Sequence, residues 1–268
     1  MSLVGVSTAI RLALTRLYSA VNGYGSEAVF SDTPPGRASP FGPFDGPVPG
    51  NLMIRQSSRI RRRLIRLSRA IARPVYTALL RFTPIVDDWE VIGQFPLKPI
   101  IFGSGSTRPF EYYLERTSTV DLDDLDDLAS WLRGCTYTSD LAEFGTPDLW
   151  QHPVDFERRR RGDCDDHALW AWRKLIELGY SAKLVSGSRG VGHLWVMFPD
   201  HAGRTILVES TAKGTRPMYM PHEEVCEDYR PYCAVGPTLE CSLYGGYLRA
   251  LRERYLETGR KKIADYVP

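Results

Sequence analysis

The stretch that decides the fold reads Gly162-Asp163-Cys164-Asp165-Asp166-His167 and continues directly into Ala168-Leu169-Trp170-Ala171-Trp172-Arg173-Lys174-Leu175-Ile176-Glu177-Leu178, before Gly179. Its apolar residues recur every three or four positions, which predicts an amphipathic helix that ends at the glycine. Cys164 then lies in the first turn, where free backbone N–H groups and the helix dipole favour a thiolate. It shares one stripe with Ala168 and Ala171, so we expect the sulfur on the side that the helix buries.

A histidine and a carboxylate follow on two runs that are typical of β-strands, residues 193–198 and 204–210, with a loop between them. If Phe198 pairs with Arg204, His193 lies directly opposite Glu209, with Cβ atoms roughly 5 Å apart. A slip of one residue would put the two side chains on opposite faces of the hairpin.

Cys164, His193 and Glu209 form a set of nucleophile, base and base-orienting group. Each of them alone also fits a structural role, and a buried cysteine is often only a small apolar residue. Their order along the chain favours an active site. His167 is the competing base, but it lies on the cysteine's own helix and is poorly placed to reach a leaving amine, so we favour His193.

The run Trp150-Gln151-His152-Pro153-Val154-Asp155-Phe156, the Gly-Asp-Cys-acid-Asp helix start, His193-Leu194-Trp195-Val196 and Val208-Glu209-Ser210-Thr211 together resemble the bacterial transglutaminase-like cysteine peptidases. The resemblance covers residues 118–215. It implies an α+β, papain-like fold in which the cysteine helix packs on an antiparallel sheet. It also implies amide chemistry through a thioester. Glu209 departs from the family, where aspartate is more usual.

The resemblance further implies calcium, which some of these peptidases bind through acidic residues beside the nucleophile, here Asp163 and Asp165. Capping of the helix explains the same two residues without any metal. Calcium needs six to eight oxygen ligands, and two aspartates alone do not supply them. Thiol chemistry itself requires no cofactor.

The expected reaction is hydrolysis of an amide bond in a protein or in peptidoglycan-like material, with acyl transfer to an amine as the neighbouring alternative. The backbone N–H of Cys164 would supply one donor for the oxyanion, and Trp150 or Gln151 the second. Four consecutive arginines, residues 158–161, are expected to stabilise the thiolate and to attract acidic substrates.

Composition divides the 268 residues into three parts. Residues 1–52 combine a short helix at 7–21 with an arm rich in proline and glycine, which cannot form a core. Residues 53–106 contain a basic amphipathic helix at 53–82 and a connector. Residues 107–268 form the catalytic domain with a C-terminal helix after Tyr244. The basic helix offers four candidate partner-binding residues, Arg59, Arg62, Arg63 and Arg66.

Such a helix can bind an assembly partner, nucleic acid or an anionic membrane, or it can be a solvated face over a core stripe. This leaves a second class of function open: a structural or ejected component of a large assembly such as a phage particle, with a vestigial or cargo enzyme domain. Arg11 and Arg16 interrupt the apolar N-terminus, so we expect no export signal and no transmembrane segment. Five unevenly spaced cysteines favour a reduced environment, the cytoplasm, or a virion if the chain is phage-encoded.

Overall fold

The computed structural model describes residues 74, 77–78, 80–95, 102–103 and 105–257. The chain divides into two compact units, Met1–Thr83 and Pro84–Pro268. In the first unit, residues 74, 77, 78 and 80–82 are helical. The expected N-terminal arm and most of the expected basic helix, with Arg59, Arg62, Arg63 and Arg66, lie outside the described residues. Among the described helices, none is long and apolar enough to cross a membrane.

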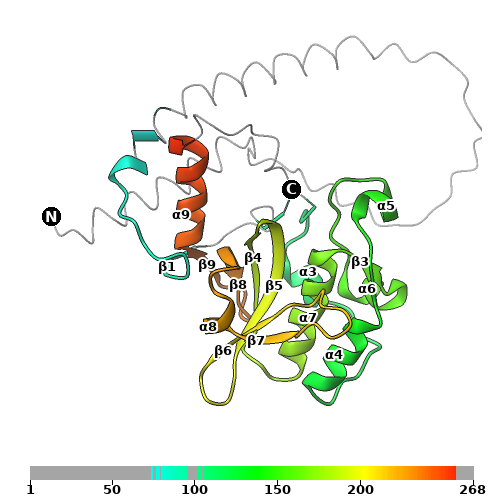
Figure 1. The fold of residues 1–268 in the computed structure, drawn as a ribbon. Helices are drawn as coiled ribbons and strands as arrows, with labels where there is room; N and C mark the ends of the chain where they lie inside the picture. Colours follow the sequence, from blue (N-terminus) through cyan, green and yellow to red (C-terminus); the bar gives the residue numbers. More distant parts are fainter. Residues whose placement is uncertain (1–73, 75–76, 79, 96–101, 104, 258–268) are drawn as a thin grey trace, which may run out of the picture. The chain divides into compact units, whose positions relative to one another are not determined.

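The second unit is built on a mixed sheet-and-helix architecture with one large antiparallel sheet, as expected (Figure 1). Seven strands follow the order β1-β9-β8-β4-β5-β6-β7, and every neighbouring pair is antiparallel. The strands are β1 (Val91–Phe95), β4 (Lys183–Arg189), β5 (Val191–Pro199), β6 (Thr205–Val208), β7 (Tyr219–Pro221), β8 (Arg230–Val235) and β9 (Cys241–Tyr244).

A smaller parallel pair lies before the cysteine helix. Strand β2 (Thr136–Tyr137) pairs with β3 (Arg161–Gly162), directly before Asp163. In Figure 1 the helices between Phe110 and Glu177 lie together beside β4 and β5, whereas the C-terminal helix lies at the other end of the sheet. The helices are α3 (Phe110–Leu114), α4 (Leu125–Arg133), α5 (Asp140–Phe144), α6 (Pro153–Arg159), α7 (Cys164–Glu177), α8 (His222–Val225), α9 (Gly245–Arg252) and the π-helix η2 (Glu253–Glu257).

Helix α7 confirms the prediction made from its sequence. It begins at Cys164 and ends at Glu177, and the expected stop at Gly179 follows the C-cap Leu178, with a φ of 88° that glycine readily adopts. Its apolar stripe is fully buried, and the Trp172 indole N–H donates a 3.1 Å hydrogen bond to the Ala182 carbonyl at the entry to β4. These contacts fix the helix against β4 and β5.

The hairpin that carries His193 and Glu209 has a different register from the one expected. Pro199 pairs with Thr205, so the loop occupies residues 200–204 and the pairing of Phe198 with Arg204 was wrong. The reason is Asp200, whose carboxylate accepts the backbone N–H groups of Ala202 and Arg204 and closes the loop later than expected. The shift is two positions across the hairpin, so both side chains keep the same face.

The sheet begins upstream of Thr107, where the catalytic domain was expected to start. Strand β1 pairs with β9, and Trp89 packs on the core cluster around Trp195 and Tyr229. Phe102 is also buried, and its carbonyl accepts a 2.9 Å hydrogen bond from Ser186 in β4. The residues between Pro84 and Thr107 that the structure describes therefore belong to the second unit, Pro84–Pro268, which we call the sheet unit.

Candidate active site

Cys164 lies at the N-terminus of α7, beside strand β5. Asp163 caps the helix, and its carboxylate accepts a 3.2 Å hydrogen bond from the Asp165 N–H. The cysteine is partly exposed, and among the groups that act on its pKa the backbone N–H of Leu194 in β5 favours the ionised form. Strand β6 pairs with β5 only as far as Val196, so this edge of β5 is open to the thiol.

The pKa of the Cys164 thiol is raised well above its usual value, first by burial and then by the negative charges of Asp165 and Asp163. The expectation that the arginine cluster stabilises a thiolate was wrong. Its four side chains are exposed and engaged elsewhere: Arg158 pairs with Asp155, Arg159 and Arg161 pair with Glu143, and Arg160 lies over the Trp131 ring. A neutral thiol of this kind needs a base to become a nucleophile.

His193 and Glu209 meet through a direct contact. The His193 Nε2 atom lies 2.9 Å from Glu209 Oε2, and both side chains are largely buried. Extending the observed register places Trp195 opposite Glu209, so His193 reaches the carboxylate diagonally. The contact occupies Nε2, which leaves the Nδ1 atom of the ring for another partner.

Glu209 is surrounded by donors that the sequence did not reveal. Its Oε2 atom accepts hydrogen bonds from the Tyr229 hydroxyl at 2.8 Å and from Arg189 at 3.3 Å, and its Oε1 atom accepts two from Thr211. Burial alone would raise the pKa of this carboxyl, but the donors, led by His193, outweigh it and lower the pKa to about 2. Glu209 is therefore a buried carboxylate at neutral pH.

His167, the competing base, is fully buried and has both ring nitrogens engaged. Its Nδ1 atom lies 2.7 Å from the Asp163 carbonyl, and its Nε2 atom lies 3.4 Å from Lys213 Nζ. Burial and the Lys213 charge lower the pKa of the imidazole to about 4. These contacts leave no ring nitrogen for the Cys164 proton.

Gln151 has no N–H group left for an oxyanion. Its backbone N–H and its side-chain amide both donate to Asp166, and the amide also donates to the Arg161 carbonyl. Asp166 in turn lies against Gly162, where a Cβ atom would come within 2.1 Å of the carboxylate. The contacts described for Trp150 are with the Tyr113 ring and with Gly103, so its role as a donor stays a prediction.

Three carboxylates gather next to Cys164. Oxygen atoms of Asp140, Asp163 and Asp165 all lie within 4.8 Å of one another. The Oδ1 atoms of Asp140 and Asp165 are buried without a hydrogen-bond partner. Burial raises the pKa of all three groups, that of Asp140 to about 6. The charge of Asp163 raises the pKa of Asp140 and Asp165 further, whereas hydrogen bonds from Asp165 lower that of Asp163. This donor set fits a hard divalent cation such as calcium, and it adds Asp140, to which no pattern in the sequence pointed.

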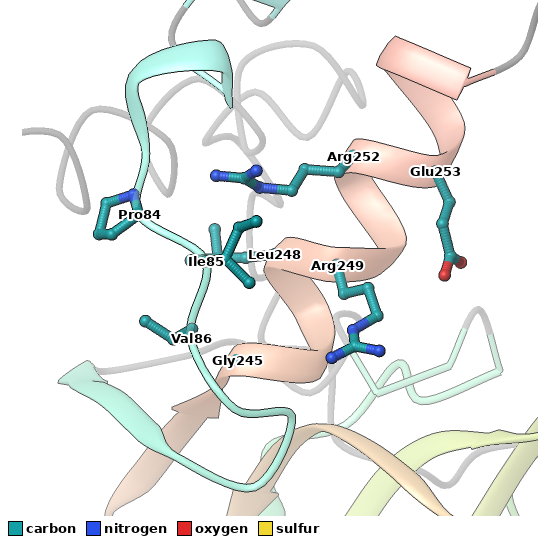
Figure 2. A pocket seen from close by; sticks show the side chains of 8 residues that line it. All are labelled: Pro84, Ile85, Val86, Gly245, Leu248, Arg249, Arg252 and Glu253. Carbon is teal, nitrogen blue, oxygen red and sulfur yellow. The ribbon is translucent and has the colours of Figure 1, made fainter.

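A cavity lies elsewhere in the sheet unit, between the segment after Pro84 and helix α9 (Figure 2). It contains none of Cys164, His193 and Glu209. Its lining comes from Pro84, Ile85, Val86, Gly245, Leu248, Arg249, Arg252 and Glu253.

Comparisons with known proteins give short or weak similarities. No protein-family model matches the chain. The centrosomal protein of 76 kDa from Pongo abelii is 30% identical over 110 residues, which cover 38% of this chain and only 17% of that protein. Calcium-bound Legionella pneumophila LapG is 18% identical with a TM-score of 0.37, over 56% of this chain and 83% of LapG. EGTA-treated LapG is 17% identical with a TM-score of 0.34, over 49% and 66%. TM-scores this low do not establish a shared fold.

Proposed function

We propose that this protein is a cysteine hydrolase of the transglutaminase-like superfamily, which cleaves an amide bond in a protein or peptidoglycan-like substrate through a thioester. The observation that supports this most is the 2.9 Å contact between His193 Nε2 and Glu209 Oε2, because His193 lies on β5, the strand against which the Cys164 helix packs. The sequence motifs around these residues and the cysteine helix against an antiparallel sheet support the superfamily.

In the proposed reaction, His193 acts as a general base through Nδ1. It takes the Cys164 proton while the sulfur attacks the amide carbonyl, and the resulting imidazolium is stabilised by the Glu209 carboxylate. When the tetrahedral adduct collapses, the C–N bond breaks and His193 returns the proton to the leaving amine. Water then attacks the thioester while His193 takes one of its protons. The C–S bond breaks, His193 returns the proton to the Cys164 sulfur, and the carboxylic acid leaves.

The backbone N–H of Cys164 is the first proposed oxyanion donor, because the N–H groups in the first turn of a helix have no partner within the helix. Trp150 remains the candidate for the second donor. Gln151 does not fit that role, because its N–H groups already donate to the Asp166 carboxylate and to the Arg161 carbonyl.

Asp140, Asp163 and Asp165 are the proposed calcium ligands, completed by further oxygen donors. A bound cation would neutralise the two carboxylates that oppose ionisation of Cys164. The protein's own contribution is to hold the three carboxylates close together at the start of α7.

A digest of a proteome-derived peptide library in H₂¹⁸O, read by mass spectrometry, tests this function. We expect new C-termini that carry ¹⁸O with the wild type and with a control variant of the partly exposed Cys226, Cys226→Ala, but none with Cys164→Ala. Glycine ethyl ester added as an amine reports acyl transfer as ester adducts. Cleavage that persists in Cys164→Ala would refute the proposal.

A further inference from the structure

Three donors from three separate elements converge on one oxygen atom of Glu209. Besides His193 in β5, the Tyr229 hydroxyl and the Arg189 guanidinium both bind Oε2, at 2.8 and 3.3 Å. The Arg189 guanidinium also lies over the Tyr229 ring, 5.0 Å from its centroid. Tyr229 is 1% exposed, so its hydroxyl has been withdrawn from water to make this contact.

A β-bulge brings these two donors to the same face of the sheet. Strand β4 pairs with β8 in one register up to Ser186, opposite Cys233, and the register shifts before Gly187, opposite Pro231. Extended from there, the pairing places Tyr229 opposite Arg189. Without the extra residue of the bulge, Tyr229 would point to the other face, away from Glu209.

His193 shares this face as well. It pairs with Gly187 in β4, two residues before Arg189, so the side chains of His193 and Arg189 project from the same side. The ring centroids of His193 and Tyr229 are 6.3 Å apart, which agrees with both side chains lying on the same face of the sheet. The bulge therefore places Tyr229 on the face of the sheet that Arg189 and His193 share, where all three side chains reach Glu209.

We propose that Tyr229 and Arg189 are positioning residues, which hold the Glu209 carboxylate aimed at His193 so that His193 can act on Cys164. This inference rests on the proposed function. Without these donors the Glu209 carboxylate could turn away from His193, and the same loss of hydrogen bonds to the ionised form would raise its titration midpoint. Thr211 also donates to the Glu209 carboxylate, and the Glu209 charge acts on the two titratable groups of α7 nearest to the nucleophile, Cys164 and His167.

The first test follows the Glu209 carboxyl carbon by ¹³C NMR in the full-length chain, with Glu209→Gln to assign the signal. The variants are Tyr229→Phe, Arg189→Gln and their combination, with Tyr244→Phe as the matched control, since Tyr244 is a second buried tyrosine of the same core cluster. Loss of a hydrogen bond to a charged group should raise the titration midpoint by about one unit for each variant. In the combined variant, Glu209 should titrate near or above about pH 4.

The second test measures alkylation of Cys164 by iodoacetamide at neutral pH, with Cys226 as the internal reference. We expect Tyr229→Phe to slow Cys164 about three- to tenfold, Arg189→Lys to recover part of the loss caused by Arg189→Gln, and Tyr244→Phe to have no effect. An unchanged Glu209 titration in the combined variant, or an unchanged Cys164 rate, would overturn the inference. A wild-type Cys164 that reacts no faster than Cys226 would instead refute the proposed function, while the Glu209 titration would still decide the positioning role.

Discussion

The His193 Nε2 atom lies 2.9 Å from the Glu209 Oε2 atom, although the two residues occupy diagonal positions across the β5–β6 hairpin. Diagonal neighbours in an antiparallel pair are separated by about 7–8 Å, more than directly opposed residues. The extra methylene of glutamate, compared with aspartate, helps to cover that separation. The departure from the more usual aspartate thus has a geometric explanation.

Glu209→Asp should therefore be nearly as damaging as Glu209→Gln, although it keeps the charge. A carboxylate displaced by about 1 Å no longer holds His193 in place, and a misplacement of that size can lower the rate about 100-fold. The ratio of Cys164 to Cys226 alkylation by iodoacetamide measures the effect. Wild-type reactivity in Glu209→Asp would contradict the role of side-chain length.

Gly162→Ala should destabilise the protein by about 1–3 kcal/mol, because the new Cβ atom would overlap the buried Asp166 carboxylate that Gln151 holds in place. Gly192→Ala is the matched control, since no heavy atom lies within 4 Å of its Cβ position. Urea unfolding of both variants measures the difference. Equal stabilities would show that Asp166 is free to move aside.

The acidic cluster predicts an unusual dependence of stability on pH. The folded-state pKa values of Asp140, Asp163 and Asp165 are raised, that of Asp140 to about 6. Their contribution to stability is thus fully present below the unfolded value of about 3.9 and is lost as the pH rises through the folded values. With a chelator present, the melting temperature should fall between about pH 4 and pH 7.

Calcium should reverse that loss, most strongly at neutral pH, because it binds the ionised carboxylates. Asp140→Asn should reduce the calcium-induced rise in melting temperature, whereas the exposed Asp126→Asn should not. Scanning fluorimetry with EDTA or calcium measures both effects. An equal rise in the wild type and in Asp140→Asn would rule out the proposed ligand.

A chain that starts at Pro84 should fold alone, whereas one that starts at Thr107 should melt at a lower temperature. The shorter chain lacks β1 and Trp89, so β9 becomes an unpaired edge and part of the core is uncovered. Thermal unfolding of the two purified chains compares them. Equal melting temperatures would show that the segment before Thr107 adds nothing to the sheet unit.

The elements whose pattern is local could be predicted from the sequence. Helix α7 follows from the apolar spacing after Cys164 and from Gly179, and the shared face of His193 and Glu209 follows from the alternation of strands. The register was wrong because the side chain of Asp200 decides where the loop closes.

Contacts that depend on distant segments could not be predicted. Tyr229 reaches Glu209 only because of the bulge between β4 and β8, which has no local signature in the sequence. Asp140 joins Asp163 and Asp165 through the fold of the α5 segment. The expectation of a thiolate at Cys164 did not account for the burial of the thiol or for the charges of Asp165 and Asp163, which raise its pKa.

The central claim is that His193 activates Cys164, and the most direct measurement is the rate of Cys164 alkylation by iodoacetamide in His193→Gln, resolved by peptide mass spectrometry. His201→Gln, in the exposed hairpin loop, is the matched control, and Cys226 is the internal reference. Removal of the general base should slow Cys164 about 100-fold and leave Cys226 unchanged, while His201→Gln behaves as the wild type. A Cys164 that reacts equally fast in His193→Gln and in the wild type would contradict the claim.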